Sequence, residues 1–218
     1  MQAEFWHDKW ESNQIGWHLN DVNPLIIDFF KELNLNKGAK VFVPLCGKSD
    51  DLVWLSNQGY EVIGIELSKI AVEDFFQTHN LQYEMCSDGT LNKYISGKIT
   101  LYQGDFFELT EKQLGAISAV FDRASMIALP ERMREEYCKH LSKLVGGAEI
   151  LLICLEYDQS AMQGPPFSVS EEEVEKHYFS QYRIKKLETT DLLVESSQFK
   201  QQGLKNLDEK VYKISANP

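Results

Sequence analysis

Two short segments, about 20 residues apart, contain residue types able to bind a polar ligand. The first is Leu45-Cys46-Gly47, where small residues at a strand-to-helix turn would let a ligand approach the backbone closely. The second is Glu66, which ends an apolar run and whose carboxylate can accept hydrogen bonds from both hydroxyls of a ribose. An ordinary tight turn and a surface glutamate are the alternatives, and the spacing favours the ribose site.

Two further segments place polar groups beside aromatic or apolar runs. In the GDFF sequence at 104–107, Asp105 could reach the edge of a heterocycle while Phe106 covers its face. The same residues could instead cap a turn and fill the core. Arg123 follows another apolar run, and its guanidinium can hold a carboxylate by two parallel hydrogen bonds. A salt bridge to Asp122 is the alternative for Arg123.

The first part of the chain is rich in aromatic residues, with Phe5, Trp6, Trp10 and Trp17 close together. Trp6 and Trp10 are four residues apart, so on a helix they would share one face. That face could pack on a sheet, or it could cover a ligand and an apolar substrate. We predict a helical, aromatic segment over residues 1–35 that serves as a lid.

The rest of the sequence alternates between short apolar runs and amphipathic segments. Strands are expected at 40–45, 61–66, 98–102, 117–121 and 148–156, and helices at 50–58, 68–78, 131–145 and 171–180. This alternation predicts a mainly parallel sheet with helices on both faces. Ligands of such sheets bind outside the carboxyl ends of the strands, where the candidate residues above occur.

The end of the chain has a less clear pattern. Residues 182–187, 191–197 and 209–214 could form strands, and the last two could pair antiparallel. We therefore expect a doubly wound α/β fold with a seven-stranded sheet and an antiparallel C-terminal strand pair. With 218 residues and no repeat or linker, the chain suits a single domain over 1–218.

Charge and composition exclude several classes of protein. The chain has 33 acidic and 22 basic residues, a formal net charge of -11, whereas phosphate polyanions and anionic membranes attract clustered Lys and Arg. No apolar run reaches the ~20 residues that a membrane span needs. The four cysteines lack C-x-x-C spacing and charges occupy the N-terminal segment. We expect a cytoplasmic monomer with no nucleic-acid or membrane partner.

Several catalytic motifs are absent from the sequence. The five histidines show no metal-ligand spacing, so no metal is expected. A G-x-S-x-G elbow and the G-x-G-x-x-G fingerprint are also missing, which argues against a hydrolase of that type and a nicotinamide-dependent dehydrogenase. Cys46 could have a lowered pKa beside a helix start, although ligand contact or packing is the preferred role.

Together these segments resemble the thiopurine S-methyltransferase family, and its bacterial members in particular. The resemblance covers almost the whole chain and weakens beyond about residue 185. It is carried by FWHDKWESNQIGWH at 5–18, VFVPLCGKSDDLVWLSNQGYEVIGIELS at 41–68, GDFF at 104–107, FDRASMIALPERMREEY at 121–137 and GPPFSVS at 164–170.

The resemblance implies a class I S-adenosylmethionine-dependent methyltransferase fold, which is Rossmann-like. It implies that Trp10, Leu45, Glu66 and Arg123 bind S-adenosylmethionine, with Glu66 on the ribose. The backbone at Asp105 and Phe106 would lie near the adenine. Trp17 would face the methyl acceptor, and Arg123 would lie between the methionine end of the cofactor and the substrate.

The expected reaction is methyl transfer to a small aromatic or heterocyclic thiol. Such a thiol is largely ionised near neutral pH, so positioning matters more than a general base, and no catalytic residue is assigned beyond an electrostatic role for Arg123. Selenium or tellurium compounds are alternative acceptors. Methylation of an oxygen or nitrogen would need a base, for which Asp8 or His18 are the candidates. A non-catalytic protein that binds S-adenosylmethionine is a further alternative.

Overall fold

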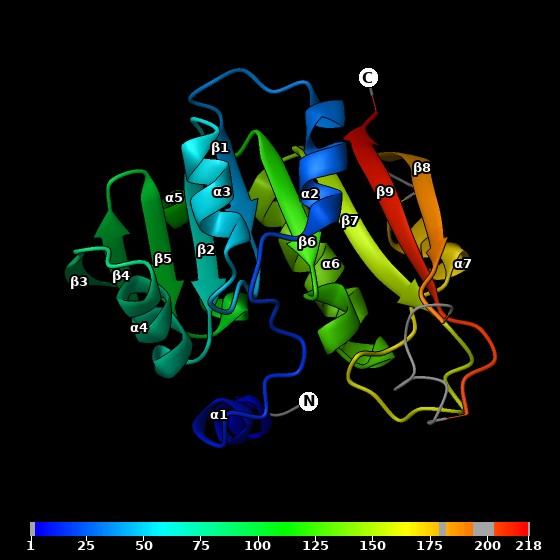
Figure 1. Ribbon diagram of the computed structural model, residues 1–218. Helices are drawn as coiled ribbons and strands as arrows, with labels where there is room; N and C mark the ends of the chain where they lie inside the picture. Colours follow the sequence, from blue (N-terminus) through cyan, green and yellow to red (C-terminus); the bar gives the residue numbers. More distant parts are fainter. Residues whose placement is uncertain (1–2, 179–181, 194–202, 218) are drawn as a thin grey trace.

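The structure is a computed structural model that describes residues 3–178, 182–193 and 203–217 (Figure 1). Its strands form one sheet in the order β3-β4-β5-β2-β1-β6-β7-β9-β8. The strands are β1 Lys40–Val43, β2 Glu61–Glu66, β3 Glu84–Asp88, β4 Leu91–Ser96, β5 Ile99–Gln103, β6 Ala119–Arg123, β7 Glu149–Glu156, β8 Tyr182–Asp191 and β9 Asp208–Ala216. The five central strands, β5-β2-β1-β6-β7, are parallel, and every pairing outside them is antiparallel.

Helices cover both faces of this sheet. The helices are α1 Ala3–Glu11, α2 Pro24–Phe29, α3 Asp51–Asn57, α4 Lys69–Thr78, α5 Glu111–Leu114, α6 Glu131–Val145 and α7 Glu171–Tyr178. Figure 1 shows α2, α3 and α4 in front of the sheet and α6 behind it, while α1 lies below the carboxyl ends of the strands. Short 3-10 turns occur at Phe30–Leu33, Phe106–Glu108 and Met126–Ala128.

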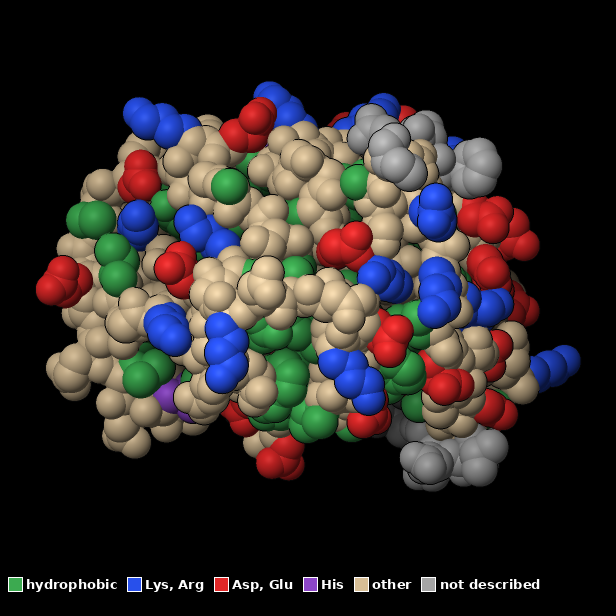
Figure 2. Space-filling model, turned by 90° about the horizontal axis from the view of Figure 1, so that it is seen from above, with side chains coloured by type: hydrophobic (Ala, Val, Ile, Leu, Met, Phe, Trp, Pro, Cys, Tyr) green, Lys and Arg blue, Asp and Glu red, His purple; other side chains and the backbone are tan. Residues whose placement is uncertain are grey.

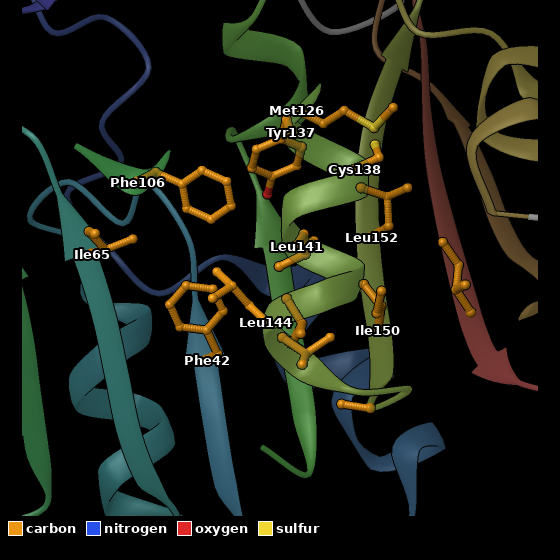
Figure 3. Close-up of a cluster of buried hydrophobic side chains, with 14 of the residues drawn as sticks. Phe42, Ile65, Phe106, Met126, Tyr137, Cys138, Leu141, Leu144, Ile150 and Leu152 are labelled. Carbon is orange, nitrogen blue, oxygen red and sulfur yellow. The ribbon is translucent and has the colours of Figure 1, made fainter. Parts of the chain in front are cut away.

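Alternation along the strands divides the core into two layers. In β1, Val41 and Val43 pack with α2, α3 and α4, whereas Phe42 packs with α6 on the other face. Figure 3 shows Tyr137, Leu141 and other α6 side chains directed at this second layer. Successive strand side chains point to opposite faces, so a central strand covered on both sides must be apolar throughout.

Local sequence signals account for the ends of several elements. Strand β1 stops at Val43 because Pro44 has no N–H group and Leu45 has a left-handed backbone with φ 45°. Ser68 is the N-cap of α4, since its hydroxyl accepts a hydrogen bond from the N–H of Ala71 at 3.4 Å. Gly146 ends α6 with φ 55°, a conformation that glycine adopts easily.

The predicted number of strands was wrong. The described residues form nine strands, because a hairpin of β3 and β4 around Gly89 extends the β5 edge. In β3 most side chains are exposed, and in β4 only Leu91 and Tyr94 are buried, so this edge lacks the apolar run of a central strand.

The C-terminal antiparallel pair exists, but it is formed by different segments than predicted. β8 and β9 pair with each other, whereas residues 191–197 were expected to be the partner of 209–214. Residues 192 and 193 form a turn, and 194–197 lie outside the described residues, as do 179–180 of the predicted helix. Periodicity cannot rank two short polar segments that are both compatible with a strand.

Among the helices of the described residues, none is long and apolar enough to cross a membrane. The end of the molecule opposite α1 shows Lys and Arg side chains dispersed among Asp and Glu (Figure 2). Cys46, Cys138 and Cys154 are buried and Cys86 is exposed, all as free thiols.

Candidate active site

A crevice opens at the carboxyl ends of the parallel strands, between these strand ends and α1, which lies below them in Figure 1. All seven predicted site residues line it, although they come from five separate parts of the chain: Trp10, Trp17, Leu45, Glu66, Asp105, Phe106 and Arg123. Strand ends of a parallel sheet meet at one edge, which is why residues distant in sequence converge there.

The loop after β1 forms the floor of the crevice. Leu45 is a left-handed non-glycine residue, a conformation that costs of order 1–3 kcal/mol and is common at ligand sites. Cys46 N–H donates to the carbonyl of Ile65 at 2.9 Å, which ties this loop to β2. The thiol of Cys46 packs over Gly64, where an added Cβ would come within 2.7 Å of the sulfur. Burial raises the pKa of Cys46, so the lowered pKa considered from the sequence was wrong.

Glu66 joins two strand-end loops through its carboxylate. Its Oε2 accepts a hydrogen bond from Gly47 N–H at 2.9 Å, and its Oε1 accepts one from Ser68 N–H at 2.7 Å. The side chain lines the crevice while the residue is 6% exposed. Burial raises the pKa of Glu66 to about 7, although these N–H donors oppose the shift. Each oxygen keeps a lone pair for a further donor, so the carboxylate can still receive hydroxyl groups.

The segment after β5 forms an aromatic wall. Asp105 caps the following 3-10 turn, since its Oδ1 accepts a hydrogen bond from Phe107 N–H at 2.9 Å. Phe106 is buried, and its ring centroid lies 4.9 Å from that of Tyr137 on α6. Figure 3 shows these two rings facing each other above the core. Asp105 is therefore a turn cap and a crevice residue at the same time.

The end of β6 carries a buried acid and a half-buried base. Asp122 does not pair with Arg123; it accepts hydrogen bonds from Tyr137 Oη at 2.7 Å and from Met126 N–H at 3.3 Å. Burial raises the pKa of Asp122 to about 6. Arg123 Nη1 donates to the carbonyl of Trp17 at 3.3 Å, which links β6 to the N-terminal segment.

The three N-terminal tryptophans line the crevice and contact one another edge to face. Trp17 makes edge contacts with Trp6 at 5.2 Å and with Trp10 at 5.9 Å between ring centroids. Trp10 is buried, and a Cβ added at Gly47 would lie 3.5 Å from its ring. The predicted lid segment divides in two, because α2 and the following 3-10 turn belong to the sheet core while α1 and Trp17 border the crevice.

Part of the crevice lining was not predicted from the sequence. Lys48 and Asp51 follow the β1 loop, and Pro165 and Pro166 come from a loop after β7. The segment from the 3-10 turn Met126–Ala128 to α6 adds further apolar surface, namely Ile127, Ala128, Leu129, Met133 and Tyr137. These positions carry no periodic or spacing signal; the motifs at 41–68, 121–137 and 164–170 contain them but did not indicate their roles.

Both acidic and basic side chains line the crevice. Asp51 accepts hydrogen bonds from Asn23 N–H and from Ser49 Oγ, both at 2.8 Å, and burial raises its pKa. Burial lowers the pKa of Arg123, while the carboxylates of Asp51 and Glu209 oppose that shift. Within the described residues, no group of three or more His, Cys, Asp or Glu could hold a metal ion. The site therefore offers hydrogen bonds, one guanidinium and aromatic surface.

Solved structures of methyltransferases share this fold. Magnesium protoporphyrin IX methyltransferase from Synechocystis PCC 6803, solved with bound S-adenosylhomocysteine, superposes with a TM-score of 0.68 at 14% identity and covers 99% of this chain and 100% of its own. A SAM-dependent methyltransferase from Anabaena variabilis gives 0.66 at 16% identity, covering 99% and 95%. The predicted fold class is confirmed by these likenesses.

Relatives in sequence are much more similar. A thiopurine S-methyltransferase of Pseudomonas fluorescens is 47% identical over 214 residues, which is 98% of this chain and 99% of the relative. One from Shewanella loihica is 45% identical over 215 residues, again 98% and 99%. Residues 1–217 match the family described as Thiopurine S-methyltransferase (TPMT). The predicted class, a SAM-dependent methyltransferase, is thereby confirmed, and the chain belongs to the thiopurine S-methyltransferase family.

Proposed function

We propose that this protein transfers the methyl group of S-adenosylmethionine to the sulfur of a small aromatic or heterocyclic thiol. One observation carries the proposal. The seven residues selected from the sequence line a single crevice at the edge of the sheet where α/β folds bind ligands. The Pseudomonas and Shewanella relatives are named for the same reaction class.

The cofactor side of the crevice fits a nucleoside with a charged tail. Glu66 presents a nearly buried carboxylate that would take the ribose hydroxyls, and the Asp105–Phe106 backbone would border the adenine. Leu45 and Trp10, which line the same crevice, would also hold the cofactor. S-adenosylmethionine supplies an activated methyl group when bound, so the protein has mainly to orient the two reactants.

The acceptor side of the crevice suits a flat and anionic molecule. Trp17 and the two residues Pro165 and Pro166 offer apolar surfaces, which favour an aromatic ring. Arg123 brings a positive charge to the same cavity and would favour a thiolate over a thiol. Aryl and heterocyclic thiols are already ionised near neutral pH, so their methylation requires orientation and exclusion of water.

Other acceptors would use the same crevice differently. Selenium or tellurium compounds need no aromatic wall, while an oxygen or nitrogen acceptor needs a base. Of the two bases considered, His18 lines the crevice, whereas Asp8 is exposed and does not line it. A protein that only binds the cofactor would have no use for the apolar surface around Trp17.

The sheet topology, the net charge and the cysteines bear on the domain organisation, oligomeric state and location of the protein. We infer that residues 1–218 act as one domain, because one sheet joins the chain from β1 to β9. A monomer in the cytoplasm with no nucleic-acid partner accords with the net charge of -11 and four free cysteines. Size-exclusion chromatography with light scattering tests the oligomeric state.

Calorimetry and methyl transfer together test the proposed function. S-adenosylhomocysteine should bind the purified protein, and labelled S-adenosylmethionine should methylate an aryl thiol faster than selenite, a phenol or an aniline. Absence of binding would refute the whole proposal. Binding with faster methylation of selenite, the phenol or the aniline would refute the thiol acceptor alone.

A further inference from the structure

His18 stands between two cavities. It lines the crevice described above, and it also lines a second, open and polar cavity. Lys48 is the other residue that borders both. The second cavity is lined by Asn13, Ile15, Gly16, Asn20, Asp50 and Thr78 besides these two. A side chain in this position can exchange a proton with the site on one side and with water on the other.

The backbone at His18 is fixed while its imidazole is free. His18 N–H donates to the carbonyl of Ile15 at 2.9 Å, and the neighbouring carbonyl of Trp17 accepts from Arg123 at 3.3 Å. Among the residues that the structure describes, no side chain or backbone group hydrogen-bonds to the imidazole of His18. Both ring nitrogens are therefore available to a ligand or to water, one as donor and one as acceptor.

Charged groups of both signs face this imidazole. The positive charges are those of Lys48 and Arg123, and the negative charges are those of Asp50 and Asp51 at the start of α3. Burial lowers the pKa of His18, helped by Lys48 and Arg123 and opposed by the two aspartates. An imidazole that is neutral near pH 7 can accept a proton, which a protonated one cannot.

Thiols that are not ionised at working pH must lose a proton when they are methylated. An alkyl thiol resembles the cysteine side chain, whose pKa is about 8.5, so it is mostly protonated at pH 7. Arg123 can stabilise a thiolate but cannot remove the proton. We propose that His18 is a further catalytic residue, which accepts the proton of a neutral thiol and passes it to water in the second cavity. This inference rests on the proposed function.

Methylation of a neutral thiol requires a proton acceptor as well as a methyl donor. The S–H proton of the acceptor moves to a ring nitrogen of His18, and the sulfur lone pair forms the new S–CH₃ bond. The electron pair of the breaking C–S bond returns to the sulfonium sulfur, which becomes a neutral thioether. The imidazolium of His18 then releases its proton to water on the outer side. With an acceptor that is already a thiolate, the proton transfers to and from His18 are not needed.

A comparison of two thiols in wild type and His18→Gln tests this role. One thiol is a nitrothiophenol, ionised at pH 7, and the other is benzyl thiol, mostly protonated at that pH. General bases contribute roughly 10²–10⁴-fold, so we expect the variant to lose at least about tenfold more kcat/KM with benzyl thiol than with the nitrothiophenol. Raising the pH above the pKa of benzyl thiol should narrow that gap, because solvent then supplies the thiolate.

Controls separate this role from damage to the site. His7→Gln changes a histidine of α1 that does not line the crevice, and its selectivity between the two thiols should match wild type. Free imidazole should restore benzyl thiol turnover in His18→Ala. Equal losses with both thiols, or no rescue, would overturn the role of His18. A wild type that methylates neither thiol would refute the proposed function itself.

Discussion

The β1–β2 side of the crevice is tied together through one carboxylate, whereas the α1 side is tied together through contacts between indole rings. Glu66 binds the N–H groups of Gly47 and Ser68 at 2.9 and 2.7 Å. Trp17 contacts Trp6 and Trp10 by ring edges, at centroid distances of 5.2 and 5.9 Å. Hydrogen bonds to a charged group are directional, while ring contacts tolerate changes in shape.

This difference matches the tasks proposed for the two sides. A single cofactor must be held in one orientation, so its side of the crevice is preorganised by short hydrogen bonds and by the left-handed Leu45. Acceptors that differ in shape can share a wall of aromatic and proline side chains. The two sides should therefore respond differently to substitution, to pH and to a change in ring size.

The largest effect is expected for Glu66→Gln. The amide loses the negative charge, and its NH₂ group would face the N–H of either Gly47 or Ser68. Hydrogen bonds to charged groups contribute about 1.5–3 kcal/mol each, so we expect roughly 100-fold weaker binding of S-adenosylhomocysteine by calorimetry. Glu61→Gln, at the exposed start of the same strand, is the matched control and should bind as wild type. Equal affinities in both variants would contradict a ribose role for Glu66.

Arg123→Ala should come second, and it should act on the acceptor side. Loss of one charged interaction in the transition state is worth about 10- to 100-fold in turnover, with a smaller change in cofactor affinity. The two quantities are measured separately, by single-turnover methyl transfer and by calorimetry. Arg132→Ala, an exposed arginine on α6, is the control. Unchanged values for both quantities would remove Arg123 from the site.

The pH dependence of cofactor binding should give a smaller, third effect. The pKa of Glu66 is about 7 in the free protein, so the carboxylate is mostly protonated at pH 6 and mostly ionised at pH 8. Ribose hydroxyls bind best to the ionised form, and we expect roughly tenfold tighter binding of S-adenosylhomocysteine at pH 8 than at pH 6. Calorimetry in two buffers of different ionisation enthalpy should detect proton release, and Glu66→Gln should abolish this dependence.

Ionisation of Glu66 should strengthen cofactor binding but lower the stability of the folded protein. The pKa of Glu66 is raised in the folded protein above its ordinary value of 4.5, so folding favours the protonated carboxyl. Its contribution to the free energy of unfolding is greatest below that value and falls as the pH rises through about 7. Thermal denaturation at pH 5 and pH 8 gives the Tm of wild type and of Glu66→Gln. Relative to wild type, the Tm of the variant should be higher at pH 8 than at pH 5.

The contrast between the two sides also explains what the sequence could predict. Strand ends after apolar runs identified Glu66, Asp105 and Arg123, because the geometry of a parallel sheet brings such positions together. Resemblance to the family was needed to assign Leu45. Pro165 and Pro166 were not assigned, since a loop after β7 reaches the crevice only through tertiary packing.

The fold shows the same division between local and non-local causes. Helix α6 was predicted with its observed bounds, because Pro130 and Gly146 mark its ends within the sequence. Hairpin β3–β4 was missed because its polar strands pair only with their neighbours at a sheet edge. The partner of β9 was assigned to the wrong segment, since pairing depends on contacts beyond any sequence window.

The smallest effect is expected for Trp17→Phe, and its comparison with Trp17→Ala is the sharpest test of tolerance on the acceptor side. Trp17→Phe keeps an aromatic ring between Trp6 and Trp10, so kcat and the cofactor affinity should change by less than about threefold. Trp17→Ala removes two ring contacts of about 0.5–1.5 kcal/mol each, and the KM for an aromatic thiol should rise roughly tenfold. Trp54→Phe in the sheet core, where the ring of Trp54 packs on Phe30 at 6.1 Å, is the control for general destabilisation. A larger loss of cofactor affinity than of acceptor affinity in Trp17→Ala would place Trp17 with the rigid side. The division between a fixed cofactor wall and an adaptable acceptor wall would then be wrong.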